Sequence, residues 1–161
     1  MKTVTFVRHG KSSWDYQVED KDRPLKERGV NDAKLVSEEF KSLNSNIDYM
    51  YSSPANRALH TSMIFTRVLE YNLDKFKVHT SLYDFSGETV LQFLKNLNNE
   101  QGSVMIFGHN YAFTTLVNTL GDTYIENVPT AGLVQVKFDV ARWGEILKGT
   151  TIKIIFPKEL R

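Results

Sequence analysis

Segments of strand character and segments of helix character alternate along nearly the whole chain. The first apolar run, Thr3–Val7, is rich in β-branched and aromatic residues, which favours a strand, and the segment Pro24–Asn44 then has apolar residues at helical spacing. Further strands are expected at 47–52, 76–79 and 104–107, and further helices after Ser53-Pro54, at 89–97 and at 112–120. Such alternation predicts a three-layer α/β/α fold, with a mostly parallel mixed central sheet flanked by helices. Ligands of such folds gather beyond the carboxyl ends of the strands.

The last part of the chain departs from this alternation. Two apolar runs, 133–139 and 150–157, surround a loop that contains Trp143-Gly144, and they are predicted to be strands antiparallel to each other. The 161 residues suffice for one domain with its own core, and no shift in composition marks a boundary. We therefore expect a single domain over residues 1–161.

The charge balance and the residue content argue against several classes of function. Twenty Lys and Arg residues against nineteen Asp and Glu leave a net charge of +1, so neither nucleic acid nor a membrane is an expected partner, and anion recognition must be local. Without cysteine there is neither a disulfide nor a thiolate metal site. No signal-peptide pattern opens the sequence and no apolar stretch approaches the roughly 20 residues that span a bilayer, so the cytoplasm is the expected compartment.

The first strand ends in Arg8-His9-Gly10, which sets an imidazole beside a guanidinium where strand becomes loop. Gly10 permits the turn that exposes His9. A neutral imidazole nitrogen can attack phosphorus directly and form a phosphohistidine, which divides one difficult hydrolysis into two easier displacements. His9 is therefore the candidate nucleophile of a phosphoryl-transfer site.

Two later motifs supply cations for the same chemistry. Ser53-Pro54-Ala55-Asn56-Arg57 opens a helix, and Gly108-His109-Asn110 follows an apolar strand. The planar guanidinium groups of Arg8 and Arg57 offer paired donors that match phosphoryl oxygens. His109 is expected to be a further phosphate donor, charged when the substrate dianion is bound.

The leaving group also needs a proton, and the loop after the third strand offers carboxylates for this role. Asp84 is the candidate general acid and Glu88 the reserve candidate, although an aspartate in a turn also commonly binds its own backbone. Ser13 and the side-chain amide of Asn110 are expected to add neutral hydrogen bonds to the substrate.

Several other chemically capable side chains are expected to have ordinary roles. Trp14 and Trp143 are predicted to be packing anchors. Lys11, Lys21 and Arg23 are predicted to form a solvated rim, with Arg23 also able to screen an incoming anionic substrate.

The motifs together resemble those of the histidine phosphatase superfamily, also called phosphoglycerate mutase-like, and the similarity extends over nearly the whole chain. The residues that carry it are Arg8-His9-Gly10, Arg57 within Ser53-Pro54-x-x-Arg57-Ala58-x-x-Thr61, and Gly108-His109-Asn110. The stretch Arg8–Asp15 together with Arg23-Pro24-Leu25 is most similar to the short branch typified by the phosphohistidine phosphatase SixA. The resemblance implies a phosphohistidine intermediate on His9, a pocket formed by both motif arginines and His109, and no metal or other cofactor.

The sequence departs from the mutase pattern at two positions. Mutase-type members usually carry asparagine where this chain has Asp15 and glutamate where it has Asp84. An inward-facing acid at 15 would repel phosphate, so Asp15 is left out of the binding set, and the shorter Asp84 has less reach. Few residues separate Asp84 from His109, where the resemblance implies a long substrate-covering insertion in mutases. An open pocket follows, which favours a bulky substrate such as a phosphohistidine on a protein, or weak activity on many small phosphoesters.

Other functions compete with this interpretation. A metal hydrolase would need ligands such as His9, His109 and Asp15, but no His-Glu-x-x-His or paired-aspartate motif is present, and the arginines would oppose a divalent cation. A module that binds phosphate or phosphoproteins with little or no turnover is a second alternative, and a small-metabolite phosphatase or mutase is a third.

Overall fold

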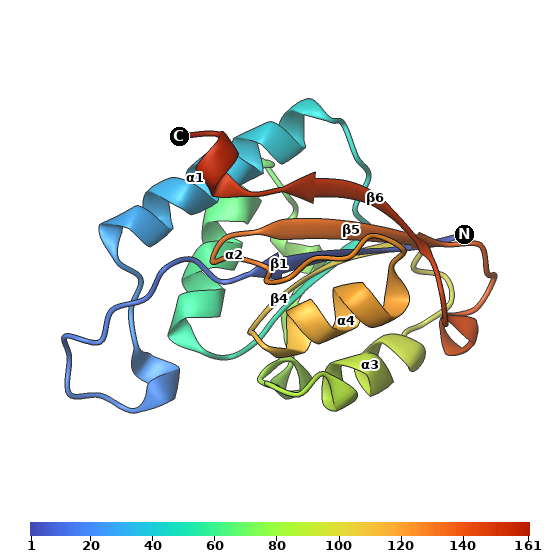
Figure 1. Ribbon diagram of the computed structural model, residues 1–161, viewed down its shortest axis with the longest axis horizontal. Coiled ribbons are helices and arrows are strands. Elements are labelled where there is room, and N and C mark those ends of the chain that lie inside the picture. Colours follow the sequence, from blue (N-terminus) through green and yellow to red (C-terminus); the bar gives the residue numbers. More distant parts are fainter.

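Six strands form one sheet in the computed structural model, which describes residues 1–161 (Figure 1). The strands are β1 (Lys2–Arg8), β2 (Tyr49–Ser52), β3 (Phe76–Val78), β4 (Ser103–Gly108), β5 (Leu133–Phe138) and β6 (Thr150–Ile155). In the order β3-β2-β4-β1-β5-β6, the first four pair in parallel, and β5 runs antiparallel to both β1 and β6. The predicted mixed, mostly parallel sheet is confirmed, and so is the antiparallel pairing of the last two strands.

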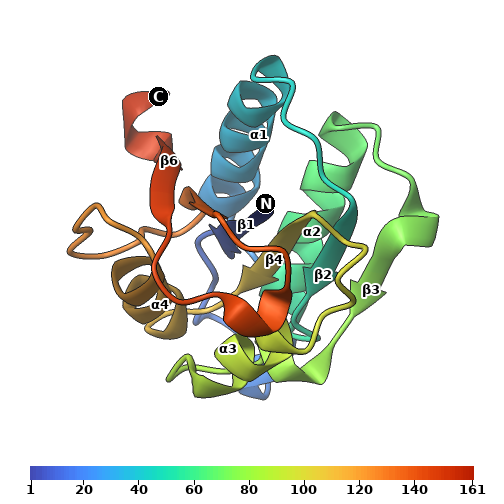
Figure 2. The same ribbon diagram turned by 90° about the vertical axis from the view of Figure 1, so that its right-hand side faces the viewer.

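Two helices cover each face of the sheet (Figure 2). α1 (Glu27–Ser42) and α2 (Asn56–Val68) lie on one face, and α3 (Glu88–Lys95) and α4 (Ala112–Leu120) lie on the other. The three-layer arrangement predicted from the alternation of segments is therefore confirmed. No helix is both long enough and apolar enough to cross a membrane.

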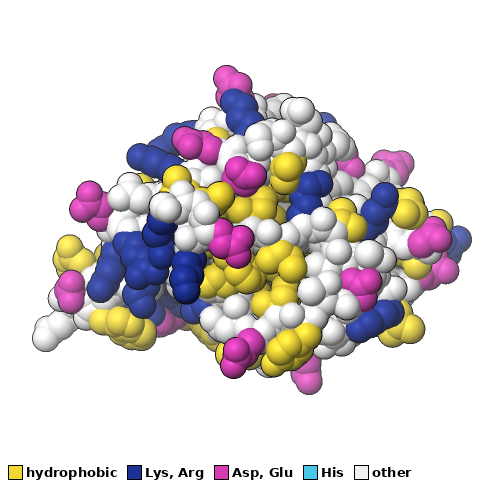
Figure 3. All heavy atoms as spheres, turned by 45° about the horizontal axis from the view of Figure 1, so that its top comes forward, with side chains coloured by type: hydrophobic (Ala, Val, Ile, Leu, Met, Phe, Trp, Pro, Cys, Tyr) yellow, Lys and Arg dark blue, Asp and Glu magenta, His cyan; other side chains and the backbone are white.

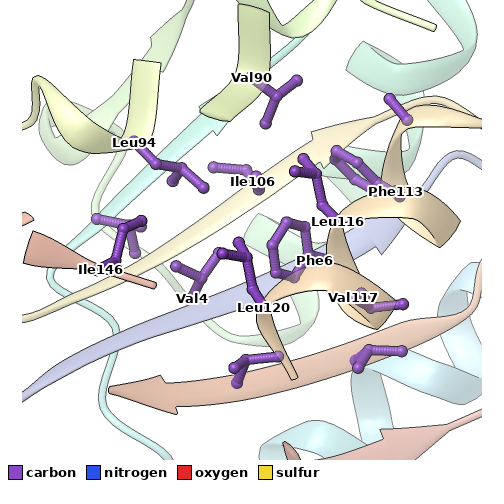
Figure 4. Close-up of a cluster of buried hydrophobic side chains, with 14 of the residues drawn as sticks. Val4, Phe6, Val90, Leu94, Ile106, Phe113, Leu116, Val117, Leu120 and Ile146 are labelled. Atoms are coloured by element: carbon purple, nitrogen blue, oxygen red, sulfur yellow. The ribbon is translucent and has the colours of Figure 1, made fainter. Parts of the chain in front are cut away.

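Side chains that alternate along the central strands fill both interfaces. On β1, Val4 and Phe6 pack with residues of α3 and α4, whereas Val7 packs with residues of α1 and α2, because successive residues of a strand face opposite sides. Figure 4 shows the first cluster, in which Phe6 lies beside Phe113 of α4, with ring centroids 5.3 Å apart in an edge-on arrangement. This two-sided packing fixes the position and register of β1.

The carboxyl ends of the central strands lie at one edge of the sheet. β1 and β4 are neighbours whose last residues are level, so the residues that follow them, His9 and His109, leave the sheet at the same height. Ser53 follows β2 on the other side of β4. A loop of residues 10–24, at the left of Figure 1, extends from this edge and contains the short 3-10 turn η1 (Asp20–Asp22).

The turn after His9 is held by close contact with two helices. A Cβ atom on Gly10 would lie 2.7 Å from the carbonyl oxygen of Gly29 in α1, and one on Gly29 would overlap the carbonyl oxygen of Lys11. The Gly10 amide also donates to Thr61 Oγ1 of α2 at 2.9 Å. Glycine is therefore required at position 10 because the chain passes directly against α1.

Candidate active site

Two histidine rings lie beside each other at the carboxyl ends of β1 and β4. The ring centroids of His9 and His109 are 5.3 Å apart, and the two residues are only 7% and 1% exposed. Nδ1 of His9 lies 2.7 Å from the carbonyl oxygen of Gly10. Because a carbonyl oxygen can only accept, Nδ1 carries the proton and Nε2 keeps the lone pair with which a neutral imidazole attacks.

Both histidines are held in the neutral form in the free protein. Burial lowers the pKa of His9 well below its usual value, and the charges on neighbouring side chains lower it further. Burial, followed by the charge on Arg57, lowers the pKa of His109 to about 3. Nε2 of His109 lies 2.8 Å from the hydroxyl oxygen of the buried Ser53. The positive charge expected on His109 is therefore absent before a substrate binds, and a phosphate dianion beside the ring would favour it.

These environments predict an unusual titration. Because burial and nearby cations disfavour imidazolium, we expect both rings to stay neutral at about pH 5, where an exposed histidine with the usual pKa of about 6.5 is largely protonated. The unfolded chain takes up these protons below about pH 6.5 and the folded one does not, so the free energy of unfolding should fall as pH drops from 6.5 toward 5. NMR of the ring nuclei in the free protein checks this, and titration of either ring near pH 6.5 would contradict it.

Two arginines lie beside the histidines, and each donates a hydrogen bond from its guanidinium group to a main-chain carbonyl oxygen. Arg8 donates from Nη1 to the carbonyl oxygen of Val128 at 2.8 Å. The nearly fully buried Arg57 donates from Nη1 to the carbonyl oxygen of Asp20 at 2.6 Å and from Nη2 to the Asp20 carboxylate at 2.9 Å. Burial lowers the pKa of Arg8, and the positive charge on Arg57 lowers it further.

Unpaired buried nitrogens are concentrated at this position. Only five buried side-chain nitrogen or oxygen atoms in the protein lack a hydrogen-bond partner, and three of them are Nε of Arg8, Nε of Arg57 and Nδ1 of His109. A positive charge on any of these three side chains lowers the pKa of His9, so all three lie near its ring. Buried polar groups are normally satisfied, and guanidinium and imidazolium nitrogens are strong donors to oxyanions. The arrangement is thus that of an anion site around a neutral imidazole.

Asp84 does not face this site with a free carboxylate. Its Oδ1 accepts from the amide and the hydroxyl of Ser86, and its Oδ2 accepts from the amides of Gly87 and Val90, at 3.0 to 3.1 Å. Burial opposes ionisation, but the hydrogen bonds, first that from Val90, lower the pKa of Asp84. A carboxylate held ionised on the first turn of α3 is a poor proton donor, which disfavours the expected role as general acid. The exposed Glu88 makes no side-chain hydrogen bond.

A substitution at Asp84 distinguishes a helix-capping carboxylate from a general acid. Asp84→Ala is expected to lower the free energy of unfolding by about 1–2 kcal/mol, as loss of a helix cap does, and to leave kcat within about threefold. A general acid would instead contribute about 10²–10⁴-fold. Denaturant unfolding and initial rates with an alkyl phosphate check this, because an alkoxide leaving group exposes a missing acid, and Asp84→Asn is the conservative control. A hundredfold loss of kcat in a folded Asp84→Ala protein would restore the acid role.

Ser13 and Asn110, the two predicted neutral donors, each have hydrogen-bond partners within the protein. The Ser13 hydroxyl accepts from the Asp15 amide at 3.0 Å. The side-chain oxygen of Asn110 accepts from the amide and hydroxyl of Thr114 in α4, and its nitrogen donates to Asn127 at 2.7 Å. Both residues hold the loops that shape the site. The Ser13 hydroxyl only accepts in this contact and Asn110 Nδ2 carries a second hydrogen, so their predicted donation to a substrate stays a prediction.

Four residues at the site were not found from the sequence. Ser53 lies in a quoted motif, and the rule that ligand residues follow parallel strands was sufficient to find it. The rings of Tyr83 and Phe85, on either side of Asp84, lie 5.3 and 5.0 Å from the His109 ring. The fourth, Asp20, gave no signal, because its contact with Arg57 depends on the path of an irregular loop.

The prediction of a solvated rim was only partly correct. Lys11 and Lys21 are exposed, but Arg23 is only 7% exposed and donates to Ser12 Oγ at 2.6 Å and to the Ser13 carbonyl oxygen at 3.1 Å. Its guanidinium also lies 3.2 Å from the centre of the Trp14 ring.

The predictions for the two tryptophans had opposite outcomes. Trp143 is fully buried as expected, whereas Trp14 is 74% exposed, so the packing role predicted for Trp14 was wrong. Trp14 stacks on Arg23 at the surface of the loop and covers no core residue.

Comparison with sequence families gives one match. The sequence model of the histidine phosphatase superfamily (branch 1) matches residues 4–86, about half of the chain. This segment contains Arg8-His9-Gly10 and Arg57 but ends before His109. No curated protein matches the chain significantly.

Solved structures with the same fold cover almost the whole chain. SixA from Agrobacterium tumefaciens is 23% identical, with a TM-score of 0.79 over 96% of this chain and 97% of that one. The protein histidine phosphatase SixA in complex with tungstate is 24% identical, with a TM-score of 0.80 over 99% of each chain. The ecdysone phosphate phosphatase from Bombix mori is 16% identical, with a TM-score of 0.66 over 95% of this chain and 92% of that one. The likeness extends through β4, which carries His109.

Proposed function

Because the chain belongs to the histidine phosphatase superfamily, branch 1, and is accordingly a phosphatase, we propose that it works through a phosphohistidine on His9 without a metal ion. The observation that carries this proposal is the set of three buried, unpaired nitrogens of Arg8, Arg57 and His109 around a neutral His9 ring. A phosphoryl group placed there supplies the missing acceptors.

The proposed reaction has two displacements. Nε2 of His9 attacks phosphorus, the bond from phosphorus to the leaving group breaks, and Arg8, Arg57 and His109 stabilise the three equatorial oxygens. A water molecule then attacks the phosphohistidine, inorganic phosphate leaves, and His9 is again neutral. The backbone carbonyl of Gly10 holds the Nδ1 proton during the attack and favours the positive charge that develops on the ring.

The leaving-group side of the site favours groups that depart without a strong acid. Asp84 is occupied on α3, and the aromatic rings of Tyr83 and Phe85 stand beside His109 instead. Phenolates and imidazoles leave more readily than alkoxides. Aryl phosphates and phosphoramidates are therefore the substrate classes that this site suits best.

The surface around the site supports a protein substrate. Trp14, Phe85 and Tyr111 are 74%, 46% and 55% exposed and come from three different loops at the carboxyl edge of the sheet. Lysine and arginine side chains gather at the left end of the face in Figure 3, the end from which the loop of residues 10–24 extends. Two neighbours of the same fold are named as SixA, one of them as a protein histidine phosphatase. We therefore propose a phosphohistidine on a protein as the substrate.

The first experiment measures phosphate release with EDTA present throughout. Nitrophenyl phosphate, an alkyl phosphate and a histidine-phosphorylated protein are compared at equal concentration. Chelator-resistant turnover, fastest on the phosphorylated protein and slowest on the alkyl phosphate, is the expected result. A strong preference for a small alkyl or sugar phosphate would overturn the substrate proposal. No turnover of any of the three, together with micromolar affinity for inorganic phosphate, would instead favour a phosphate-binding module.

A further inference from the structure

Asp20 connects three separate parts of the chain at the edge of the anion site. Its main-chain oxygen and its Oδ2 accept from the two Nη atoms of Arg57 on α2, at 2.6 and 2.9 Å. The same Oδ2 accepts from the hydroxyl of Tyr83 at 2.6 Å, and Oδ1 lies 3.4 Å from Nη1 of Arg23. No other carboxylate in the protein forms an ion pair with Arg57, Arg8 or either histidine of the site.

We propose that Asp20 is a positioning residue, which orients the Arg57 guanidinium so that its Nε and remaining hydrogens face the phosphoryl group. The inference rests on the proposed function of the site. If Asp20 has this role, the loop of residues 10–24 forms part of the anion site.

The guanidinium group of arginine is planar. Its nitrogens are coplanar and their hydrogens point in fixed directions, so anchoring both Nη atoms fixes the direction of Nε. In Arg57 both Nη atoms are anchored on one residue, while Nε is buried and unpaired. The side chain of Arg57 is only 3% exposed and that of Asp20 is 42% exposed, so Asp20 is the partner that faces solvent. Asp20 therefore occupies the Nη edge of Arg57, and Nε is left to meet an anion.

The charge and the second partner of Asp20 agree with a fixed contact. Partial burial opposes ionisation, but the hydrogen bonds from Tyr83 and Arg57 lower the pKa of Asp20 to about 2, so the carboxylate is ionised at neutral pH. Tyr83 also packs edge-on against the His109 ring. The Asp20 carboxylate thus fixes Arg57 relative to Tyr83, which contacts His109.

The test compares substitutions of Asp20 with a matched substitution in the same 3-10 turn. Asp20→Ala removes the acceptors of Arg57 Nη2 and Tyr83, and we expect kcat/KM with nitrophenyl phosphate to fall at least about tenfold. Asp20→Asn keeps an oxygen for Arg57 Nη2 and is expected to stay within about threefold of the wild type. The control is Asp22→Ala, because the exposed Asp22 side chain bonds no residue of the site, and it is expected to change nothing.

A double-substitution cycle adds a readout that a general loss of stability would not move. Tyr83→Phe removes the hydroxyl that donates to Asp20 and keeps the ring against His109. We expect this change to reduce kcat/KM in the wild-type background and to have no further effect in Asp20→Ala. Equal effects in the two backgrounds would mean that Tyr83 and Asp20 act separately, which would overturn the proposed connection.

Two outcomes overturn the positioning role itself. Faster turnover or tighter phosphate binding in Asp20→Ala would show that the carboxylate competes with the phosphoryl group. An Asp20→Asn protein as impaired as Asp20→Ala would show that charge matters and the hydrogen bond does not. Calorimetric titration with inorganic phosphate keeps the test independent of turnover: if the wild type hydrolyses nothing, the proposed function fails, and weaker phosphate binding by Asp20→Ala alone still supports the inference.

Discussion

Replacement of His9 by alanine is expected to reduce turnover by at least about 10⁴-fold, because the substitution removes the atom that forms the covalent bond to phosphorus. The neighbouring His109 contacts Ser53 through Nε2, and its unpaired Nδ1 is proposed to donate to a phosphoryl oxygen and not to attack phosphorus. The fold should persist, since His9 takes part in no core cluster.

Two measurements check this prediction. Steady-state phosphate release gives the loss of rate, and rapid denaturation during turnover should trap an alkali-stable, acid-labile phosphoryl group on the wild type but not on His9→Ala. His60→Ala is the matched control, because His60 is exposed on α2 and is expected to be dispensable. A His9→Ala protein that keeps a tenth of wild-type activity would show that another group is the nucleophile.

Arg57→Lys is expected to cost about 10²–10³-fold in kcat/KM although it preserves the positive charge. Arg57 acts in three directions at once, with two Nη atoms on Asp20 and Nε free toward the site. A lysine has one nitrogen on a flexible stem. The lysine ammonium group can bind either Asp20 or the phosphoryl group with good geometry. It cannot bind one of them and also offer two parallel donors to the other.

The matched control for this change lies on the same helix. Arg67 is exposed in the last turn of α2, so Arg67→Lys is expected to leave kcat/KM and the free energy of unfolding unchanged. Full activity in Arg57→Lys would mean that the site requires only a charge at this position. Titration with inorganic phosphate separates weaker ground-state binding from a loss confined to the transition state.

Much of the architecture follows from local sequence patterns. Strand and helix segments could be predicted because burial on one or both faces imposes a period on the apolar residues, as in Thr3–Val7 and the helix after Ser53-Pro54. His9 and His109 could both be placed at strand ends. That β1 and β4 are neighbours, which brings the rings to 5.3 Å, rests on the resemblance, because local periodicity does not specify which strands pair.

The side-chain roles were harder to predict because short polar side chains have several partners within reach. Asp84, Ser13 and Asn110 each satisfy nearby backbone or side-chain groups, and the same residue types would suit contact with a substrate. Local hydrogen bonds occupy both carboxylate oxygens of Asp84, whereas Ser13 and Asn110 each keep a hydrogen that can be donated. Asp20 shows the opposite case, in which a loop residue without any local signal becomes the partner of a buried arginine.

The turn that carries the proposed nucleophile and the loop proposed to orient Arg57 are supported by different parts of the molecule. His9 donates its amide to Gly108 of β4, and Gly10 is held by Thr61 of α2 and packed against Gly29 of α1. Asp20, by contrast, lies in an exposed loop that contributes to neither core cluster. The molecule is thus modular: the loop between Trp14 and Asp22 can be rebuilt around Asp20 to accept new partners while the backbone support of His9 stays intact. A methyl group at Gly29, by contrast, would overlap Lys11 and disturb the turn that follows His9.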